Sequence, residues 1–423
     1  MLKTLLRRAW FFVGSVTVLF LAGADWPRFR GPEGAGVAPD SRPPVEWSDK
    51  ENLTWKTPLP GAGASSPIVV GDRIFVTCYS GYGLSEDEPG NIEDLTLHVV
   101  CASLADGKIL WDKAVKAKQP EQAYRSYITN HGYASATPAS DGQAVYVSFG
   151  RSGVYAYSLS GEQLWQADIG TRTHDWGSAV APILFDNLVI VNACVESGAV
   201  LALDKTSGKE VWRFGGLKES WSTPLVVSLP DGRRDLVVSS RGQVFGLDPA
   251  TGKKRWECRG VQQYVCPSVM AHGDVAFVTA GIKTHTLAIR AGGEGDVSAS
   301  RILWESKDGS KVGTPLYHNG HLYWVDQAGI AFCVNAETGK TVYKERLQVR
   351  ARRDKVYASP VLADGRLYVV TREDGIVVLA AEPEFKELGR NRLDDKSIFN
   401  ATPAIVGNRL VLRSDRFLYC IGK

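Results

Sequence analysis

Short apolar segments separated by polar turns recur along the whole chain, and most are only as long as a β-strand. In the clearest stretch we expect strands near residues 178–182, 184–193, 199–203 and 210–214. The turn at residues 204–209 places an Asp, which bonds its own downstream backbone, before a Gly, which accepts a positive φ. No segment has the pattern of a long helix, so the pattern predicts an all-β protein.

A Ser/Thr-Pro dipeptide, or a variant of it, marks the start of eight repeats. Successive prolines lie 71, 44, 42, 43, 48, 45 and 43 residues apart. A period in the forties that contains several strands is typical of a β-propeller with one blade per repeat. The prolines are Pro67, Pro138, Pro182, Pro224, Pro267, Pro315, Pro360 and Pro403.

An aromatic residue follows at the expected fourth strand of each repeat, where a large ring can pack against the next blade. The eighth repeat ends after its third strand, whereas Trp55 lies in a fourth-strand pattern without three strands before it. We therefore predict an eight-bladed β-propeller whose N-terminal strand closes the last blade and covers its open edge. The expected anchors are Trp55, Trp111, Trp165, Trp212, Trp256, Trp304, Tyr343 and Phe385.

The first 24 residues have the pattern of a secretory signal peptide: a basic start, an apolar run and a small-residue site ending at Ala24. We expect cleavage near Ala24 and a periplasmic or otherwise exported chain without a transmembrane span; an uncleaved anchor is the alternative. The expected division is 1–24 signal peptide, 25–46 N-terminal extension and 47–423 propeller. A net charge of +3 over 423 residues gives no argument for a nucleic-acid partner.

Seven cysteines occur, without a CxxC or an adjacent pair. Most are expected to be small buried strand residues. An exported protein permits disulfides, and Cys78 with Cys101 is the best candidate pair because both fall on neighbouring strands of the first blade.

The repeats resemble the pyrroloquinoline-quinone (PQQ)-like propeller repeat, which reads roughly Ala-x-Asp-x-x-Thr-Gly-x-x-x-Trp. The best matches run from Ala202 to Trp212 and from Gly246 to Trp256. The segment Asp-Trp-Pro-Arg-Phe-Arg-Gly-Pro at residues 25–32 is also similar to the start of a group of exported bacterial PQQ-like repeat proteins. This resemblance implies the fold more strongly than an activity, because the motif describes blade packing.

Two branches of this family imply different functions. Quinoprotein dehydrogenases hold PQQ with Ca²⁺ in the axial channel, often beneath a Cys-Cys pair, but this chain has no such pair and no matching metal-ligand set. The other branch is the non-catalytic eight-bladed lipoprotein of the outer-membrane β-barrel assembly machinery, from which this chain departs by lacking a lipid-attachment Cys. We therefore expect no cofactor, with PQQ and Ca²⁺ as the alternative.

Long loops on a rigid frame are the usual place for binding. Two insertions, residues 81–94 and 114–134, are expected on the same face, where residues preceding the first strands converge on the axis. These residues form either a funnel for a ligand or peptide, or a plug of the channel; a catalytic or metal-binding His-Asp pair is a weaker hypothesis. The candidate binding residues are Arg125, His131, His174, Asp175, Trp176, Trp221, Tyr264 and Tyr357, with Asn400 beside them.

A basic loop on the same face suits an acidic partner or anionic lipid headgroups, or is simply solvated. It contains Arg346, Arg350, Arg352, Arg353 and Lys355. The sequence thus favours an exported, non-catalytic scaffold that binds a protein or another envelope component. A PQQ-dependent or other redox enzyme is the alternative, and hydrolysis or carbohydrate binding on this face also stays open.

Overall fold

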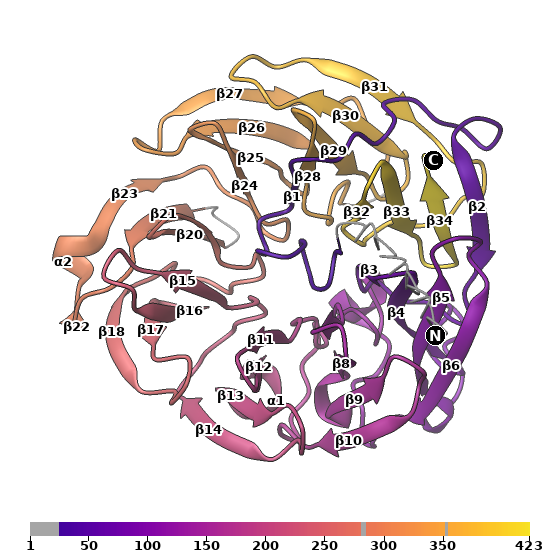
Figure 1. The fold of residues 1–423 in the computed structure, drawn as a ribbon, viewed down its shortest axis with the longest axis horizontal. Helices are drawn as coiled ribbons and strands as arrows, with labels where there is room; N and C mark the ends of the chain where they lie inside the picture. The colour runs from indigo at the N-terminus through magenta and orange to yellow at the C-terminus, as the bar shows by residue number, and fades with distance from the viewer. Residues whose placement is uncertain (1–24, 281–284, 352–353) are drawn as a thin grey trace, which may run out of the picture.

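The computed structural model of the chain describes residues 25–280, 285–351 and 354–423. Eight sheets of four or five strands stand in a ring around a central axis, so the predicted all-β, eight-bladed propeller is confirmed (Figure 1). The expected signal peptide at 1–24, like Arg352 and Arg353, lies outside the described residues.

Each blade has four antiparallel strands, which follow sequence order from the axis outward in seven of the eight blades. The innermost strands are β3 (Ile68–Val70), β7 (Ala139–Ser140), β11 (Ile183–Phe185), β15 (Leu225–Ser228), β19 (Met270–His272), β24 (Leu316–His318), β28 (Val361–Ala363) and β32 (Ala404–Val406). The second strands are β4 (Arg73–Ser80), β8 (Ala144–Ser148), β12 (Leu188–Ala193), β16 (Arg234–Ser240), β20 (Val275–Ala280), β25 (His321–Val325), β29 (Arg366–Val370) and β33 (Arg409–Arg413).

The outer half of each blade consists of its third and fourth strands. The third strands are β5 (Thr96–Ser103), β9 (Val154–Ser158), β13 (Ala199–Asp204), β17 (Gln243–Leu247), β21 (His285–Arg290), β26 (Ile330–Asn335), β30 (Ile376–Ala380) and β34 (Phe417–Ile421). The fourth strands are β6 (Ile109–Lys116), β10 (Gln163–Ala167), β14 (Glu210–Gly215), β18 (Lys254–Arg259), β23 (Ile302–Ser306), β27 (Thr341–Arg346), β31 (Glu387–Asn391) and β2 (Leu53–Pro58).

Two short strands extend individual blades in parallel. β1 (Val37–Ala38) pairs with the innermost strand of blade seven, and β22 (Gly295–Asp296) pairs with the outer strand of blade four. The helical turns are η1 (Ile92–Asp94), η2 (Ser126–Asn130), η3 (Gly150–Ser152), α1 (Cys194–Ser197) and α2 (Ser298–Arg301).

The ring closes as the sequence predicts. β2 pairs antiparallel with β34, and Trp55 stands opposite Cys420. The last blade therefore takes its outer strand from the start of the propeller, and both ends of the propeller are held in one sheet (Figure 1).

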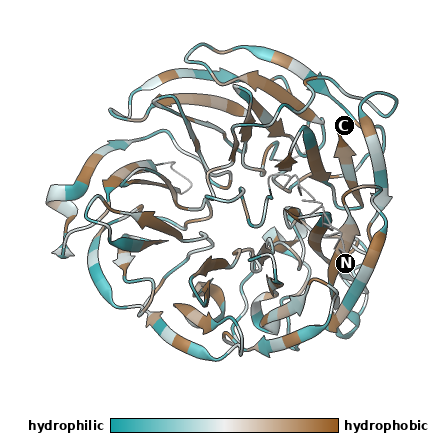
Figure 2. Ribbon diagram, in the orientation of Figure 1, coloured by the Kyte–Doolittle hydropathy of each residue, from teal (hydrophilic) through white to brown (hydrophobic). Residues whose placement is uncertain are grey.

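The core lies between neighbouring blades. All six residues of β12 are buried, whereas β6 alternates between exposed and half-buried residues. Figure 2 shows hydrophobic residues concentrated in the inner strands and alternating with polar residues along the outer ones. This is the pattern expected for sheets packed on both faces with one solvated edge.

Hydroxyl groups link the innermost strands around the axis. The backbone N–H of one blade donates to the side-chain hydroxyl of the next in seven bonds of 2.9 to 3.3 Å. Ala181 interrupts this series because it has no hydroxyl to accept the N–H of Thr137. We call these residues the hydroxyl ring: Ser66, Thr137, Thr223, Ser268, Thr314, Ser359 and Thr402.

The hydroxyl ring explains why Ser/Thr-Pro recurs along the chain. It also shows that one of the eight predicted prolines, Pro267, does not occupy the repeated position. In blade five the ring residue is Ser268 and β19 begins at Met270, so Val269 stands where the other blades have proline. Pro267 lies two residues before that position, and the uneven spacing around it follows. The N–H of Val269 donates to the carbonyl of Thr223 over 3.2 Å, which a proline cannot do.

Two predicted strand boundaries are also wrong. The first strand of blade three, expected near residues 178–182, is β11 at Ile183–Phe185. The strand expected at 184–193 is split, because Phe185 ends β11 and Leu188 starts β12. Asp186 between them has a φ of 49°, a left-handed turn conformation that the alternation of apolar residues does not reveal.

Five of the tryptophan anchors make the same contact with the next blade. The indole N–H donates to a carbonyl in the turn between the third and fourth strands of that blade, over 2.7 to 3.1 Å. This contact supports the predicted packing role. The pairs are Trp55 with Leu104, Trp111 with Leu159, Trp165 with Lys205, Trp212 with Pro249 and Trp304 with Ala336.

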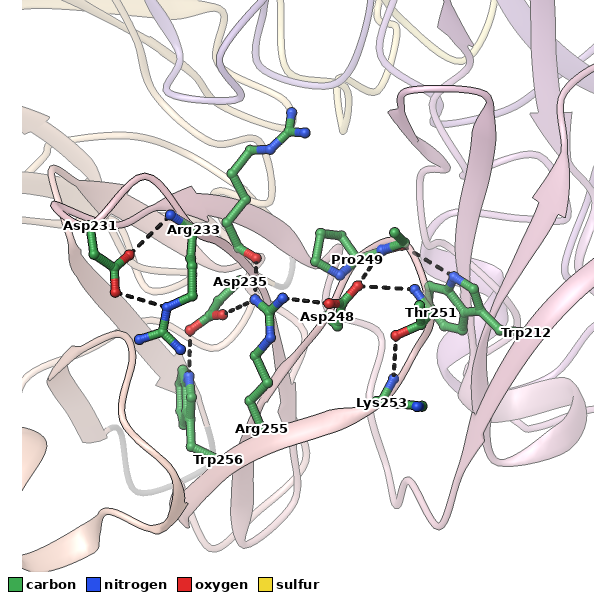
Figure 3. A network of polar contacts seen from close by, with 12 residues as sticks. Trp212, Asp231, Arg233, Asp235, Asp248, Pro249, Thr251, Lys253, Arg255 and Trp256 are labelled. Atoms are coloured by element: carbon green, nitrogen blue, oxygen red, sulfur yellow. Dashed lines mark hydrogen bonds and ion pairs between the residues drawn. The ribbon is translucent and has the colours of Figure 1, made fainter.

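Trp256 is held differently, because β22 and α2 interrupt the corresponding turn of blade five. Its indole N–H donates to the fully buried carboxylate of Asp235 over 2.6 Å. Arg255 bonds the same carboxylate over 2.7 Å and also pairs with Asp248 (Figure 3). The negative charge of Asp235 is therefore balanced by Arg255 within blade four.

Blade seven lacks the predicted anchor. Phe385 precedes β31 and packs edge-on against Tyr343 of blade six, with 5.7 Å between ring centroids. The anchor position, opposite Val378, is occupied by Gly389. A Cβ there would lie 3.0 Å from Val45, so the missing side chain makes room for the N-terminal extension.

The predicted Cys78–Cys101 disulfide is wrong; all seven cysteines are free. Cys78 stands opposite His98, and Cys101 stands opposite Phe75. The two thiols lie on opposite faces of blade one, because side chains alternate along a strand. Cys78 packs towards blade eight and Cys101 towards blade two.

Candidate functional site

A cavity of about 450 Å³ lies on the axis of the propeller. Residues that precede the innermost strands surround its upper part, and the hydroxyl ring lines its deeper part. It reaches the surface beside Tyr127, whose side chain is 55% exposed on η2 of the 114–134 insertion. The cavity therefore opens on the face where binding was predicted.

Five aromatic residues, which we call the aromatic collar, line the mouth: Tyr127, Trp176, Trp221, Tyr264 and Tyr357. The ring of Trp176 lies 4.4 Å from that of Tyr264 and 4.9 Å from that of Trp221, measured between centroids. Tyr127 covers the same indole at 5.1 Å. Rings in mutual contact form a rigid apolar wall suited to burying a ligand's apolar surface.

Polar contacts fix the other side of the mouth. The hydroxyl of Tyr357 donates to Asp354 over 2.7 Å, and the Arg372 guanidinium lies 4.6 Å above the Tyr357 ring. Asn400 donates over 2.6 Å to the carbonyl of Asn130 in the long insertion. The insertion is thereby tied to the loop that precedes blade eight.

His131 has a structural environment. One ring nitrogen, Nε2, lies 2.8 Å from the carbonyl oxygen of Trp176, so it must carry a proton, and Nδ1 accepts from the Ser135 hydroxyl at 2.6 Å. Burial lowers the pKa of His131, which keeps the ring neutral in this arrangement. The neutral imidazole positions Trp176 in the wall.

The deeper wall offers hydrogen-bond donors. Each hydroxyl of the ring accepts a backbone N–H, and none donates its own proton to an acceptor among the described residues. Lys311 also lines the cavity. Acceptor atoms of a ligand, such as carbonyl or carboxylate oxygens, would therefore find unused O–H donors at this depth.

The N-terminal extension closes the opposite end. Trp26 pairs with Val69 of blade one, the N–H of Ser140 in blade two donates to the Pro27 carbonyl, and the side chain of Phe29 lines the cavity. Figure 1 shows this segment crossing the centre of the ring. The axial channel is therefore a pocket with one mouth and a floor.

The structure brings together most, but not all, of the predicted site residues. His131, Trp176, Trp221, Tyr264, Tyr357 and Asn400 line the cavity. Arg125, His174 and Asp175 are exposed and do not line it. His174 packs against Trp221 at 4.9 Å, and Asp175 accepts from Gln122 at 2.7 Å. Binding by the predicted residues stays a prediction.

Sequence reasoning missed several lining residues. Lys311 and Asp354 precede a ring hydroxyl, as Trp221, Tyr264 and Tyr357 do, so their position in the repeat was an available signal, whereas Tyr127 lies in the insertion where binding was expected. Nothing in the repeat points to Phe29, because the extension lies outside the repeating unit.

A row of polar side chains on blade one has the residue types of a hydrolase triad. His98 bonds Ser80 at 2.8 Å and Asp112 at 3.0 Å. The row joins the second, third and fourth strands of one sheet, and His98 is only 8% exposed. None of the three lines the axial cavity, so this geometry supports cross-strand stabilisation.

The donors around the cavity do not fit PQQ held with Ca²⁺. Calcium in proteins prefers six to eight oxygen ligands with carboxylates among them. Asp354 is the one carboxylate among the described lining residues, and the Tyr357 hydroxyl already bonds it. Within the described ranges no group of three or more His, Cys, Asp or Glu side chains is placed to hold a metal ion.

No helix in the described part of the chain is both long and apolar enough to cross a membrane.

Eight blades around an axial pocket, with turn-to-tryptophan contacts at five of the blade junctions, define the class of PQQ-like repeat β-propellers. The family model described as outer membrane protein assembly factor BamB matches residues 45–175, 96–263, 196–295 and 294–413. The chain belongs to this family, which confirms the resemblance drawn from its repeats.

Individual relatives are distant. Outer membrane protein assembly factor BamB of Burkholderia pseudomallei is 23% identical over 364 residues, covering 83% of this chain and 82% of that protein. Tetrathionate hydrolase of Acidithiobacillus ferrooxidans is 26% identical over 219 residues, but these cover only 49% of this chain and 38% of the hydrolase.

Solved structures agree on the fold. BamB from Moraxella catarrhalis superposes with a TM-score of 0.56 at 12% identity, covering 87% of this chain and 99% of that one. A europium-containing methanol dehydrogenase gives 0.58 at 12% identity, covering 92% and 89%. Because one neighbour is an enzyme and the other an assembly factor, this likeness shows the scaffold alone.

Proposed function

We propose that the chain is an exported, non-catalytic propeller of the bacterial envelope that holds a segment of a protein partner in its axial cavity. The relatives named as outer membrane protein assembly factors support a partner in that process. The observation that carries the proposal is an aromatic-walled pocket, open beside Tyr127 and closed by Phe29.

The two levels of the pocket suit a protein segment. Apolar or aromatic side chains of the segment bury surface against the aromatic collar, as anchors do at protein interfaces. Its backbone carbonyls meet the unused O–H donors of the hydroxyl ring. The exposed basic residues Arg346 and Arg350 attract acidic parts of the same partner.

Photo-crosslinking from single positions tests this. A benzoylphenylalanine at Tyr127 reports on the mouth, and one at Val211, which is 52% exposed on β14, reports on the outer edge. We expect a discrete crosslink to an envelope protein from the mouth and at least about tenfold less from the edge.

Trp176→Ala should reduce the mouth crosslink at least about tenfold, because a central aromatic anchor is removed. Leu303→Ala, at a position 42% exposed on an outer strand, is the matched control and should leave it unchanged. Equal crosslinking from both positions, or none from Tyr127, would overturn the proposal.

A further inference from the structure

The axial pocket is built from two complete layers of the repeat. The lower layer is the hydroxyl ring with Ala181 in its remaining place, and the upper layer is the residue two positions before each of these. Every member of both layers lines the cavity. The upper layer consists of Ala64, Ser135, Ala179, Trp221, Cys266, Val312, Tyr357 and Asn400.

Around the mouth, the lining residues divide into an apolar and a polar side. Trp176, Trp221 and Tyr264 precede the innermost strands of blades three, four and five, and their rings are in contact. Lys311, Asp354 and Asn400 precede those of blades six, seven and eight. An occupant of the pocket therefore meets aromatic rings on one side and polar groups on the other.

Lys311 is the cation of the polar side. It and Asp354 are the charged residues among the described lining, since His131 is neutral. The Asp354 carboxylate already accepts from Tyr357, whose ring also carries the Arg372 guanidinium. Lys311 is half-buried and has no hydrogen-bond or ion-pair partner among the described residues. Its long, flexible stem lets the ammonium reach an anionic group bound at the mouth.

The shape of the pocket favours the end of a chain. Phe29 closes the floor, so a segment that enters must stop or turn back. Turning back needs two backbones roughly 5 Å apart together with their side chains. The cavity of about 450 Å³ lies in the lower half of the usual range for ligand pockets, and a chain end fills it with one backbone.

The chemistry of the pocket selects between the two ends of a chain. A carboxyl-terminal end brings two oxygen atoms that accept from Lys311 and from the unused O–H groups of the hydroxyl ring. An amino-terminal end would bring a second cation beside Lys311. The carboxyl-terminal end is therefore the better match.

We propose that the pocket holds its partner by the carboxyl-terminal residue. The free carboxylate binds Lys311 and the hydroxyl ring, and an apolar or aromatic side chain of the same residue packs against Trp176, Trp221 and Tyr264. This inference rests on the proposed function, which requires only that some segment of a partner enters the mouth.

Titration calorimetry of the full chain with three peptides tests the carboxylate. Acetyl-Ala-Ala-Phe with a free carboxylate should bind at least about tenfold more tightly than the same peptide ending in a carboxamide. Acetyl-Phe-Glu-Ala carboxamide, whose carboxylate lies within the chain, should bind no better than the first carboxamide. If the free acid does not bind, or binds no more tightly than either carboxamide, the proposal is overturned.

Variants of Lys311 assign the preference to this residue. Lys311→Met should weaken binding of the free acid at least about tenfold and leave the carboxamide unchanged, whereas Lys311→Arg keeps the charge and most of the preference. Lys340→Met is the matched control, because Lys340 is exposed in the turn between β26 and β27 of the same blade. A preference for the acid that survives Lys311→Met overturns the proposal.

The photo-crosslink from Tyr127 separates this inference from the proposed function. Mass spectrometry of the adduct should place the crosslink in the carboxyl-terminal peptide of the partner. An adduct in an internal peptide leaves the proposed function standing and overturns this inference, and the absence of any adduct overturns both.

Discussion

Gly252 shows how the absence of a side chain joins two blades. Its φ is +69°, and a Cβ would lie 2.5 Å from Cε3 of Trp212 in the preceding blade. The same indole donates to the Pro249 carbonyl at 3.1 Å, in the turn that contains Gly252. The Asp-x-x-x-Gly turn and the tryptophan one blade earlier therefore form a single packing unit.

Gly252→Ala should destabilise the fold by about 3 kcal/mol, combining the left-handed backbone penalty with overpacking against Trp212. Gly365→Ala is the matched control, since its φ is +68° and nothing lies within 4 Å of the added Cβ. It should cost only the backbone penalty of about 1–2 kcal/mol. Denaturant unfolding measures both; equal losses would refute the packing unit.

Glu121 gives the fold a dependence on pH. Burial raises its pKa from 4.5 to about 7. Between these two values the unfolded carboxyl has lost its proton while the folded one keeps it, so this residue makes stability fall as pH rises through that window. At pH 8 the folded chain carries a buried carboxylate beside Arg151, which offsets part of the cost.

Glu121→Gln should therefore stabilise the protein at pH 8 by about 2 kcal/mol and have little effect near pH 4. Urea unfolding across this pH range measures the difference, with the exposed Glu88→Gln as control. If Glu121→Gln changed stability by the same amount at every pH, the raised pKa of Glu121 would be contradicted.

At the scale of the strands, the hydroxyl ring converts eight separate sheets into one connected layer around the axis. Its members are at most 9% exposed, so each bond satisfies a backbone N–H that water does not reach. The series is broken only where Ala181 faces the N–H of Thr137, within the described residues.

Ala181→Thr should complete the ring and stabilise the fold by about 1 kcal/mol, because it supplies an acceptor to a buried N–H and its methyl group can enter the cavity. Thr314→Ala should do the reverse and cost about 1–3 kcal/mol by leaving the N–H of Ser268 without its acceptor. Calorimetry of both variants tests the pair; a destabilised Ala181→Thr would show that the gap is required.

The sequence predicts strands and blades well where each repeat obeys the same local rule. Turn chemistry and the fourth-strand tryptophan recur, and so Trp55 could be paired with the last blade. Prediction failed where one blade departs from the others: Val269 replaces a proline, and Gly389 replaces an aromatic ring because Val45 packs there. Those departures depend on contacts between segments far apart in the chain.

At the scale of the whole molecule, the propeller is a closed ring whose two faces differ. The insertion face collects aromatic residues because the inter-blade loops converge there, which the repeat spacing predicts. The opposite end is closed by the extension, and the placement of Phe29 beneath the axis follows from no periodic pattern. The mouth of the pocket was therefore predictable and its floor was not.

Binding at the mouth is the central claim, and hydrogen–deuterium exchange on the complex with the crosslinked partner measures it most directly. Protection should appear in residues 126–135, 174–177, 262–266 and 355–357, and not in the outer strands or in residues 25–36. Protection confined to the outer strands or the floor would contradict the account.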